Sequence, residues 1–519
     1  MKIVGIVLVI IFLIAAIAAF VMNVLHVRGF VKSPIEAVDH KKILKKSLIL
    51  NISFAVAMDI AINMIYLAIE VTPLWWEVLL TVLLVPTCAF ALATLYTTFR
   101  IHYYRRNLPQ DIDKKLYYAM CISLPVLIVS LWYSFNGFAN YITYPIPSGI
   151  SFTNGWTYPG SVAGGFSIAF YALSILSGAL FVYFLCDHKM YQQYGKHGII
   201  ESTFLVAFPA GILGARIWYV IGNWKVDGFD QDPLMMFRIW EGGLTVLGGA
   251  IMGIVVGVLW FIWRNKQYSI WIAVDMIVPT ILLAQAIGRL GNFFNCEVHG
   301  NPVPVEAWNW LPQIIVRNGM FSSSEPALTN GTFYLPLFLI EGVLNIGGYF
   351  VIASLFGKKF RKYTELGDLG FAYVVVYGVI RSALEPLRNT SFNMGENGYW
   401  SWIFSCLFVV FGTLGIFGNH LVRHLIRKKK NKVKQDEDIH VFAKRSLIVG
   451  GSIAGVLLVT GTIFMIVGEP VLTSLVYNLF NAGVILLCAG VGVLLLSANS
   501  IIYLFETRKP VVQNEGGNA

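Results

Sequence analysis

Thirteen apolar runs of about 20 residues follow one another along the chain, and this succession limits the possible folds more than any other feature. A helix of that length crosses the roughly 30 Å of hydrocarbon in a bilayer, where backbone groups must pair within the protein. We therefore predict an all-α, polytopic integral membrane protein. The predicted spans are 3–23, 47–69, 75–98, 116–135, 166–186, 198–221, 243–263, 269–290, 333–356, 367–387, 398–420, 446–467 and 474–505, and the last run is long enough to contain a break.

The formal net charge of +10 would by itself be compatible with a nucleic-acid partner, but the basic residues lie in short loops between the predicted spans. Only 13% of the residues are charged, against about 25% in soluble domains. Lys and Arg gather in every second loop, namely 24–46, 99–115, 187–197, 264–268, 357–366 and 421–445. Basic loops stay on the cytoplasmic side of a bilayer. We expect a multi-pass protein of the cell membrane with an external N-terminus, a cytoplasmic C-terminus, contacts with membrane lipids and no nucleic-acid partner.

The six cysteines indicate neither a metal site nor a disulfide framework. They are scattered, mostly within apolar runs, and lack metal-like or disulfide-like spacing. We interpret them as small core residues, and we expect no metal and no other cofactor.

Changes in composition divide the chain into blocks. A stretch rich in Gly, Pro and Ser precedes the fifth predicted span, and a strongly basic stretch follows the eleventh. We predict a four-helix N-terminal membrane extension over 1–145, a core of seven helices over 146–425, a basic cytoplasmic linker over 426–445 and further membrane helices over 446–519. Neither extension has a predicted role.

Polar groups that a bilayer disfavours gather at one depth of the central block. An arginine at the centre of a span costs about 2.5–3.5 kcal/mol on insertion scales. Such residues are therefore expected to have a structural or functional role. The planar fork of donors on arginine suits phosphate oxygens. Toward the external ends of their predicted spans lie Tyr171, Arg216, Glu241, Arg289, Glu341, Arg381, Glu385 and Arg388, whereas Asp275 lies nearer the cytoplasm and is assigned a structural role. The cluster predicts a cavity for a phosphate-bearing amphiphile.

The spacing of these residues leaves two interpretations open. Arg381, Glu385 and Arg388 stand at i, i+4 and i+7, which places them on one face of a helix. One alternative is that the charges only pair with one another, Glu385 with Arg381 or Arg388, and Arg289 with Glu297. Because several arginines share one depth, a ligand site is favoured over pairing alone.

The stretch Gly288 to Gly300, GRLGNFFNCEVHG, resembles the signature of the prolipoprotein diacylglyceryl transferase family, Gly-Arg-x-Gly/Ala-Asn-Phe-x-Asn-x-Glu-x-x-Gly, at every fixed position. Other segments follow the family's order: IAFYALSILSG, LGARIWYV, RIWEGGLTVLGGAIMG, PLFLIEGVLN and YGVIRSALEPLR. The resemblance covers about 166–425 and implies a membrane transferase. Its substrates would be phosphatidylglycerol and a prolipoprotein signal peptide, whose lipobox cysteine thiol receives the diacylglyceryl group at the outer leaflet while glycerol phosphate leaves.

The resemblance also implies roles for individual positions. Arg289 and Arg381 match the family's phosphate-binding arginines, and both are expected to be catalytic together with Glu297 and His299. The expected substrate-binding residues are Tyr171, Arg216, Gly248, Asn292, Asn295, Gly300, Tyr377, Glu385 and Arg388.

One departure from the family pattern concerns the base that activates the thiol. Where the family usually has His-Gly-Gly, this chain has Leu247, Gly248 and Gly249, and leucine cannot transfer a proton. Either that histidine is not obligatory, or His299, Glu297 or a tyrosine replaces it. His299 is the first candidate, and a structural role for it is equally open. The glycines are also explained by close helix packing.

Two rival functions remain open. The same arginines could serve a transporter or flippase for an anionic lipid or solute, or a lipid-binding protein without catalytic activity. A transport pathway would carry charge at both mouths, whereas here the charge gathers on the external side. This asymmetry favours the transferase.

Overall fold

The computed structural model describes most of the chain. The described residues are 2–32, 40–69, 114, 121–122, 124–126, 129, 149–151, 155–157, 167–225, 227–238, 243, 246–308, 310–311, 313–323, 328, 331–389, 399–430, 437–469 and 478–506. They form two compact units, and each unit is considered by itself.

Helices dominate the described part of the chain. Eight are long and apolar enough to cross a membrane: Ile3–Gly29, Phe170–Tyr194, Glu201–Gly222, Ile270–Phe294, Leu337–Lys359, Trp402–Lys429, Ile439–Val467 and Leu479–Phe505. This confirms the prediction of an all-α, multi-pass membrane protein. The predicted span 75–98 lies outside the described residues and 116–135 largely does, so the number thirteen stays a prediction. The last predicted run forms one continuous helix over its described residues.

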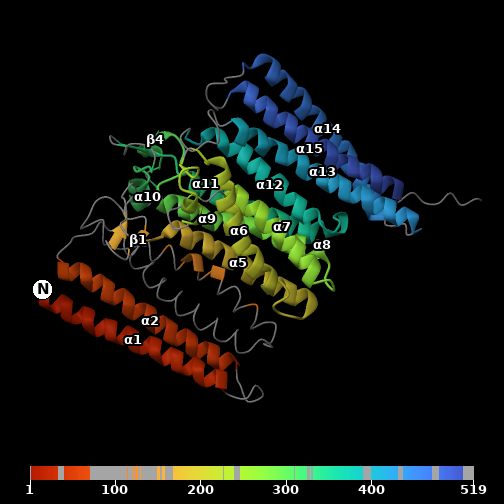
Figure 1. Cartoon of the computed structure of the whole chain (residues 1–519). Coiled ribbons are helices and arrows are strands. Elements are labelled where there is room, and N and C mark those ends of the chain that lie inside the picture. Colours follow the sequence, from red (N-terminus) through yellow and green to blue (C-terminus); the bar gives the residue numbers. More distant parts are fainter. Residues whose placement is uncertain are drawn as a thin grey trace, which may run out of the picture. The chain divides into compact units, whose positions relative to one another are not determined.

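The first compact unit comprises Met1–Ala273 and Leu283–Gly342. Its elements are α1 (Lys2–Lys32), α2 (His40–Ile69), β1 (Gly149–Ser151), β2 (Gly155–Thr157), β3 (Ser167–Ala169), α5 (Phe170–Tyr194), α6 (Glu201–Gly222), α7 (Val246–Arg264), most of α9 (Ile281–Phe294), β4 (Pro302–Pro304), α10 (Gln313–Asn318) and β5 (Thr332–Tyr334). β1 pairs antiparallel with both β2 and β3. Helices α1 and α2 lie side by side (Figure 1), and buried Asn23 bonds to Ser47 and Asn51 across them. Such polar contacts fix the register of two otherwise apolar helices.

The second compact unit comprises Val274–Leu282 and Val343–Ala519. It contains the end of α8 (Ile270–Ile277), the later part of α11 (Leu337–Phe350) with a π-helical continuation Val351–Lys359, and the helices α12 (Asp368–Leu384), α13 (Tyr399–Lys429), α14 (Glu437–Val467) and α15 (Leu479–Glu506). Helix α13 packs against α12 and α15, and α14 packs against α15 (Figure 1). Asp275 accepts a hydrogen bond from the backbone N–H of Leu369 at 3.0 Å and pairs with Arg361 at 3.4 Å, which confirms its structural role.

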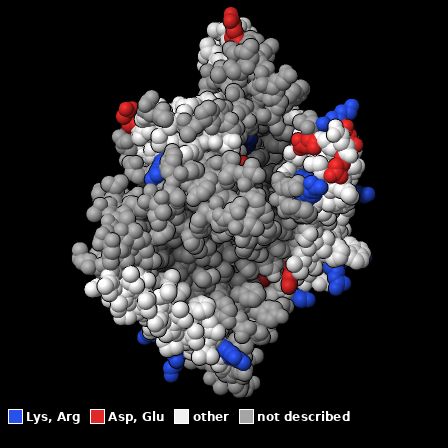
Figure 2. Space-filling view, turned by 60° about the vertical axis from the view of Figure 1, so that its left-hand side comes forward, with Lys and Arg blue, Asp and Glu red and all other residues white. Residues whose placement is uncertain are grey.

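The surfaces of the described helices match a lipid environment. Large aliphatic side chains such as Ile448, Val456 and Ile466 of α14 are more than half exposed. Uncharged residues make up most of the described surface in Figure 2, and Lys and Arg lie in small separate groups. Apolar patches of this extent are rare on soluble monomers, so these faces are explained by contact with acyl chains.

Glycines allow α6 and α7 to approach closely. A Cβ on Gly248 would meet the Cβ of Trp218 and the backbone oxygen of Gly214, whereas a Cβ on Gly253 would lie 3.5 Å from the nearest atom, the oxygen of Ala207. Packing therefore accounts for Gly248 within the first unit, and the expected contact of Gly248 with substrate stays a prediction.

We expect Gly248→Ala to lower the free energy of unfolding by about 1–3 kcal/mol, because overpacking displaces neighbouring side chains and backbone. The matched variant Gly253→Ala should unfold at the wild-type temperature or slightly above, since its methyl group meets only an ordinary van der Waals contact. Thermal unfolding in detergent measures both. Equal stability of the two variants would contradict the close α6–α7 packing.

A short segment connects the membrane helices α9 and α11 and has its own small core. Within this connecting segment (residues 301–336), β4 and β5 pair antiparallel, with Pro302 opposite Tyr334. Leu311, Val316 and Phe333 are buried together between the strands and α10. The segment therefore forms a structured cap at the end of α9, where the sequence signature ends.

Candidate active site

The signature residues leave the helix at the end of α9. Helix α9 ends at Phe294, and Cys296 and Val298 then adopt φ angles of 53° and 57°. Left-handed backbone is uncommon for residues other than glycine and exceptional for a β-branched valine, and it costs about 1–3 kcal/mol at each position. Such strain persists only where surrounding contacts hold it. The helix therefore unwinds after Phe294, within the signature.

Backbone hydrogen bonds hold this bend on both sides. The N–H of Glu297 donates to the oxygen of Asn292 at 3.0 Å, and the N–H of Ser323 donates to the oxygen of Cys296 at 2.9 Å. The N–H of Gly300 donates to the oxygen of Leu335 at 3.0 Å. The predicted substrate-binding residue Gly300 therefore joins the signature to the connecting segment.

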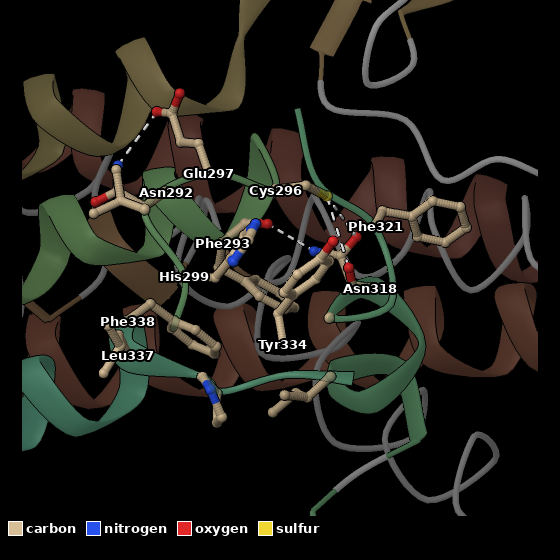
Figure 3. Close-up of a pocket in the computed structure, with 14 residues that line it drawn as sticks. Asn292, Phe293, Cys296, Glu297, His299, Asn318, Phe321, Tyr334, Leu337 and Phe338 are labelled. Atoms are coloured by element: carbon tan, nitrogen blue, oxygen red, sulfur yellow. Dashed lines mark hydrogen bonds between the residues drawn. The ribbon is translucent and has the colours of Figure 1, made fainter. Parts of the chain in front are cut away.

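A chain of polar side chains runs from α9 into the bend. Arg289 Nη1 donates to Asn292 Oδ1 at 3.0 Å, and Asn292 Nδ2 donates to Glu297 Oε1 at 3.2 Å (Figure 3). Asn295 Nδ2 lies 3.5 Å from the same carboxylate oxygen. We call Arg289, Asn292 and Glu297 the signature relay. It links a cation to a carboxylate through one amide.

The direct ion pair of Arg289 with Glu297, considered as an alternative to a ligand site, is not formed between these two residues. Arg289 Nη2 instead lies 2.8 Å from Glu341 Oε1 on α11, and the Glu341 side chain is only 4% exposed. The reason is geometric, because Asn292 follows Arg289 by three residues on the same helix face and stands between Arg289 and the bend. The sequence predicts Glu341 at the depth of the site, but Glu341 is not among the predicted catalytic or substrate-binding residues.

Burial changes the acidity of Glu297. Removal from water raises the pKa of its carboxyl, and hydrogen bonds from Asn292 and Asn295 and the charge of Arg289 partly offset this rise. A carboxylate with a raised pKa holds a proton more strongly than an exposed glutamate, so it is a better general base near neutral pH.

His299 is enclosed by its neighbours. Nδ1 lies 3.0 Å from the backbone oxygen of Gly300, and Nε2 lies 2.8 Å from Ser322 Oγ. A carbonyl can only accept, so we assign the proton to Nδ1, which leaves Nε2 to accept from the Ser322 hydroxyl. The ring also stacks on Tyr334, with 3.8 Å between centroids. The lone pair that a base would use is therefore already engaged.

A small cavity of about 30 Å³ opens beside the relay. Asn292, Glu297 and His299 provide polar groups, and aromatic rings such as Phe293, Phe321 and Phe338 provide apolar walls (Figure 3). This volume suffices for about one water molecule or one small group of a substrate. The cavity places such a group next to the partly buried carboxylate of Glu297.

Tyr171 is a predicted substrate-binding residue that also lies in the first unit. It lies in the first turn of α5, and a Cβ on Gly291 would meet its ring. The glycine of the signature thus lets Tyr171 pack directly against α9, one residue before Asn292. Tyr171, Arg289, Asn292, Asn295 and Glu297 are brought together in one unit.

The side chain of Arg216 binds the backbone of a neighbouring loop. Its guanidinium donates to the backbone oxygens of Met235, Met236 and Gly243 at 2.7, 3.0 and 3.1 Å. Gly243 has a φ of 68°, and a Cβ there would meet Arg216 Nη1. The expected contact of Arg216 with substrate stays a prediction. Glu241 and the side chain of Leu247 lie outside the described residues.

The second unit holds the other charged cluster. Arg381 Nη2 lies 2.5 Å and Arg388 Nη1 lies 3.7 Å from the carboxylate of Glu385, which is fully buried. The pairing considered as an alternative is therefore present. Two guanidiniums therefore share one carboxylate. Tyr377 lies one turn before Arg381 and stacks on Tyr373, with 5.9 Å between centroids.

Asn318 and Ser322 contribute to the site and were not predicted. Both lie in the connecting segment, and Asn318 Nδ2 donates to the backbone oxygen of Phe293 at 2.6 Å. No spacing or motif singles them out, because polar residues are ordinary in a loop. Only the folded arrangement of the segment around the signature identifies them.

The fold and the site define a class of protein, namely a multi-pass membrane protein with arginines and carboxylates buried at helix ends. The model of the prolipoprotein diacylglyceryl transferase family matches residues 160–418. A phosphatidylglycerol–prolipoprotein diacylglyceryl transferase of Malacoplasma penetrans (strain HF-2) is 32% identical over 316 residues, which cover 54% of this chain and 85% of that protein. Similar transferases of Halalkalibacterium halodurans and of Clostridium botulinum (strain Langeland) are 32% and 33% identical, covering 48% and 45% of this chain and 81% and 85% of those proteins. The chain belongs to the prolipoprotein diacylglyceryl transferase family, and it is a membrane transferase.

Proposed function

We propose that this protein transfers the diacylglyceryl group of phosphatidylglycerol to the lipobox cysteine thiol of a prolipoprotein signal peptide. The sulfur attacks the glyceryl carbon that bears the phosphate, a C–S bond forms and the C–O bond breaks. Glycerol phosphate leaves with the bonding electrons, and the thiol proton passes to a base. The observation that carries the proposal is the signature relay beside a small cavity in a member of this transferase family.

Arg289 is proposed to stabilise the departing phosphate. A guanidinium has five N–H donors, and among the described residues Arg289 uses one for Asn292 and one for Glu341. Donors already oriented toward the developing negative charge stabilise a transition state strongly in a site with little water. Glu341 and Asn292 fix the orientation of Arg289 before the substrate arrives.

Glu297 is proposed as the base that activates the thiol. An unperturbed cysteine thiol has a pKa of about 8.5, so at neutral pH a base must remove its proton. Burial raises the pKa of the Glu297 carboxyl, which brings it closer to the range that suits a general base. His299, the first candidate from the sequence, is less suited because Ser322 engages its Nε2.

We accordingly expect His299→Ala to lower kcat less than about tenfold, since a histidine that only packs and orders the bend contributes no proton transfer. A loss of 10² to 10⁴ would instead match the contribution of a general base. Ser322→Ala is the companion variant. If His299 were the base, removing the hydroxyl would free its lone pair and leave activity unchanged or higher.

The remaining expected site residues complete the proposal. Arg381 and Arg388 are proposed to bind phosphate oxygens, and Tyr377 to support them. Tyr171, Arg216, Gly248, Asn295 and Gly300 are proposed to shape the substrate cavity.

Location and domain organisation are also proposals. We place the protein in the cell membrane with its N-terminus outside and its C-terminus in the cytoplasm, because basic loops alternate along the chain. The transferase core is proposed to cover 146–425, with 1–145 and 446–519 as membrane extensions joined through the basic linker 426–445. In this orientation the signature lies at the outer leaflet, where an exported prolipoprotein would meet it.

The decisive experiment follows label from the lipid to the peptide. The purified full-length protein is given phosphatidylglycerol labelled in the glycerol carbons of its diacylglyceryl group and a lipobox peptide, and a peptide with serine in place of the cysteine serves as the control. A labelled, base-stable thioether on the cysteine peptide alone supports the proposal. Absence of transfer, or label on the serine peptide, contradicts it, and lipid movement between leaflets without transfer would indicate the flippase.

A further inference from the structure

We propose that Asn318 is a positioning residue for the transfer reaction, which holds the signature bend so that Asn292 and Glu297 keep their productive geometry. The inference rests on the proposed function for its kinetic consequence, and on the contacts of the connecting segment for its structural basis. Asn318 lies outside the signature motif, which covers residues 288–300.

The side chain of Asn318 ties down the end of α9. It lies at the last residue of α10 and is 2% exposed. Its Nδ2 donates to the backbone oxygen of Phe293 at 2.6 Å, and the same oxygen accepts the N–H of Cys296 at 3.2 Å. Carbonyl groups in the last turn of a helix lack intrahelical partners. Asn318 therefore caps α9 from a segment that lies 25 residues further along the chain.

The other side of Asn318 meets the first strained residue. The Cys296 thiol lies 3.6 Å from Asn318 Oδ1 and 3.8 Å from its backbone oxygen (Figure 3). Burial raises the pKa of this thiol to about 12, with a smaller opposing effect of the Asn318 hydrogen bond. The thiol thus stays protonated and donates. Asn318 contacts the bend on both sides of Phe294, through Phe293 and Cys296.

These contacts act on the relay through the backbone. Cys296 directly precedes Glu297, and its left-handed φ turns the chain so that the Glu297 carboxylate returns to Asn292. A backbone in such a strained conformation relaxes when its restraints are removed. Displacement of a catalytic group by about 1 Å can cost about 10²-fold in rate. The side chain of Asn318 therefore controls the reaction without touching the reacting atoms.

The test compares Asn318→Ala with the matched variant Asn265→Ala. Asn265 is also buried and also donates from Nδ2 to a backbone oxygen, that of Ile199 at 3.1 Å, but it belongs to no part of the site. Asn318→Ala is expected to lower kcat about 10- to 100-fold, with KM for phosphatidylglycerol within about threefold of wild type. Asn265→Ala should keep kcat within about twofold. Asn318→Asp, which keeps the size and the acceptor but loses the donor, should behave like alanine.

Two further readouts separate this role from general destabilisation. In Asn318→Ala the acidic limb of the pH–rate profile should shift, because the hydrogen bonds to Glu297 change, and a maleimide should label Cys296 at least about tenfold faster than in wild type. Peptide mass spectrometry assigns the labelled cysteine. Wild-type labelling of Cys296 with an unchanged pH profile in folded Asn318→Ala would overturn the positioning role. Failure of the wild type to transfer label would overturn the proposed function instead, and the labelling comparison would still decide what Asn318 holds.

Discussion

Arg289→Ala is expected to lower kcat/KM for diacylglyceryl transfer about 10²- to 10³-fold, the effect of removing one oriented donor from a developing anion. The structure gives this arginine a fixed orientation between Asn292 and Glu341 rather than an exposed, mobile one. The loss should fall on kcat more than on KM, because charge on the leaving phosphate develops in the transition state. Steady-state transfer of labelled lipid to a lipobox peptide measures both constants.

The control must separate a catalytic role of Arg289 from its structural role as the ion-pair partner of Glu341. Removing the arginine breaks its ion pair with the buried Glu341 carboxylate, and breaking a buried pair can by itself cost about 3–5 kcal/mol. The double variant Arg289→Ala/Glu341→Gln removes that charge and should regain thermal stability without regaining activity. Arg238→Ala removes an arginine that is 42% exposed and should leave the rate unchanged. Restored activity in the double variant would refute the phosphate role.

Glu297→Gln should lower kcat about 10²- to 10⁴-fold, the usual contribution of a general base. Glutamine keeps the shape and can still hydrogen-bond to Asn292 and Asn295, so the fold of the bend should survive. The measurement is single-turnover transfer at pH 7. Glu306→Gln, an exposed glutamate of the connecting segment, is the matched control and should be fully active.

If Glu297 is the base, the direction in which activity changes with pH can also be predicted. A base must be ionised to act, and burial raises the pKa of Glu297. Activity should therefore fall as the pH drops through a value above the ordinary glutamate pKa of about 4.3, and it should be fully present only above that value. In Glu297→Gln this acidic limb should be absent from the residual rate. A limb that persists in the variant would assign the base to another group.

Much of the fold could be predicted because the bilayer imposes simple rules on the sequence. Apolar runs of about 20 residues identify the spans, and the described helices occur where these runs predict them, as with Glu201–Gly222 and Ile439–Val467. The structural role of Asp275 was also predicted, since a charge so far from the others calls for a local partner. The pairing of Arg289 with Glu341 was not predicted, because sequence spacing does not show which side chain of another helix comes near.

The sequence by itself determined the membrane-spanning helical fold, the family and the candidate residues, because hydrophobicity, loop charge and the signature GRLGNFFNCEVHG are local properties of the chain. Only the tertiary structure decided how those residues are used. Glu341 became the partner of Arg289 because the first residues of α11 lie beside α9. His299 became enclosed because the connecting segment folds back over the strained bend. Hydrogen bonds between residues far apart in the chain set these geometries, and no spacing along the sequence encodes them.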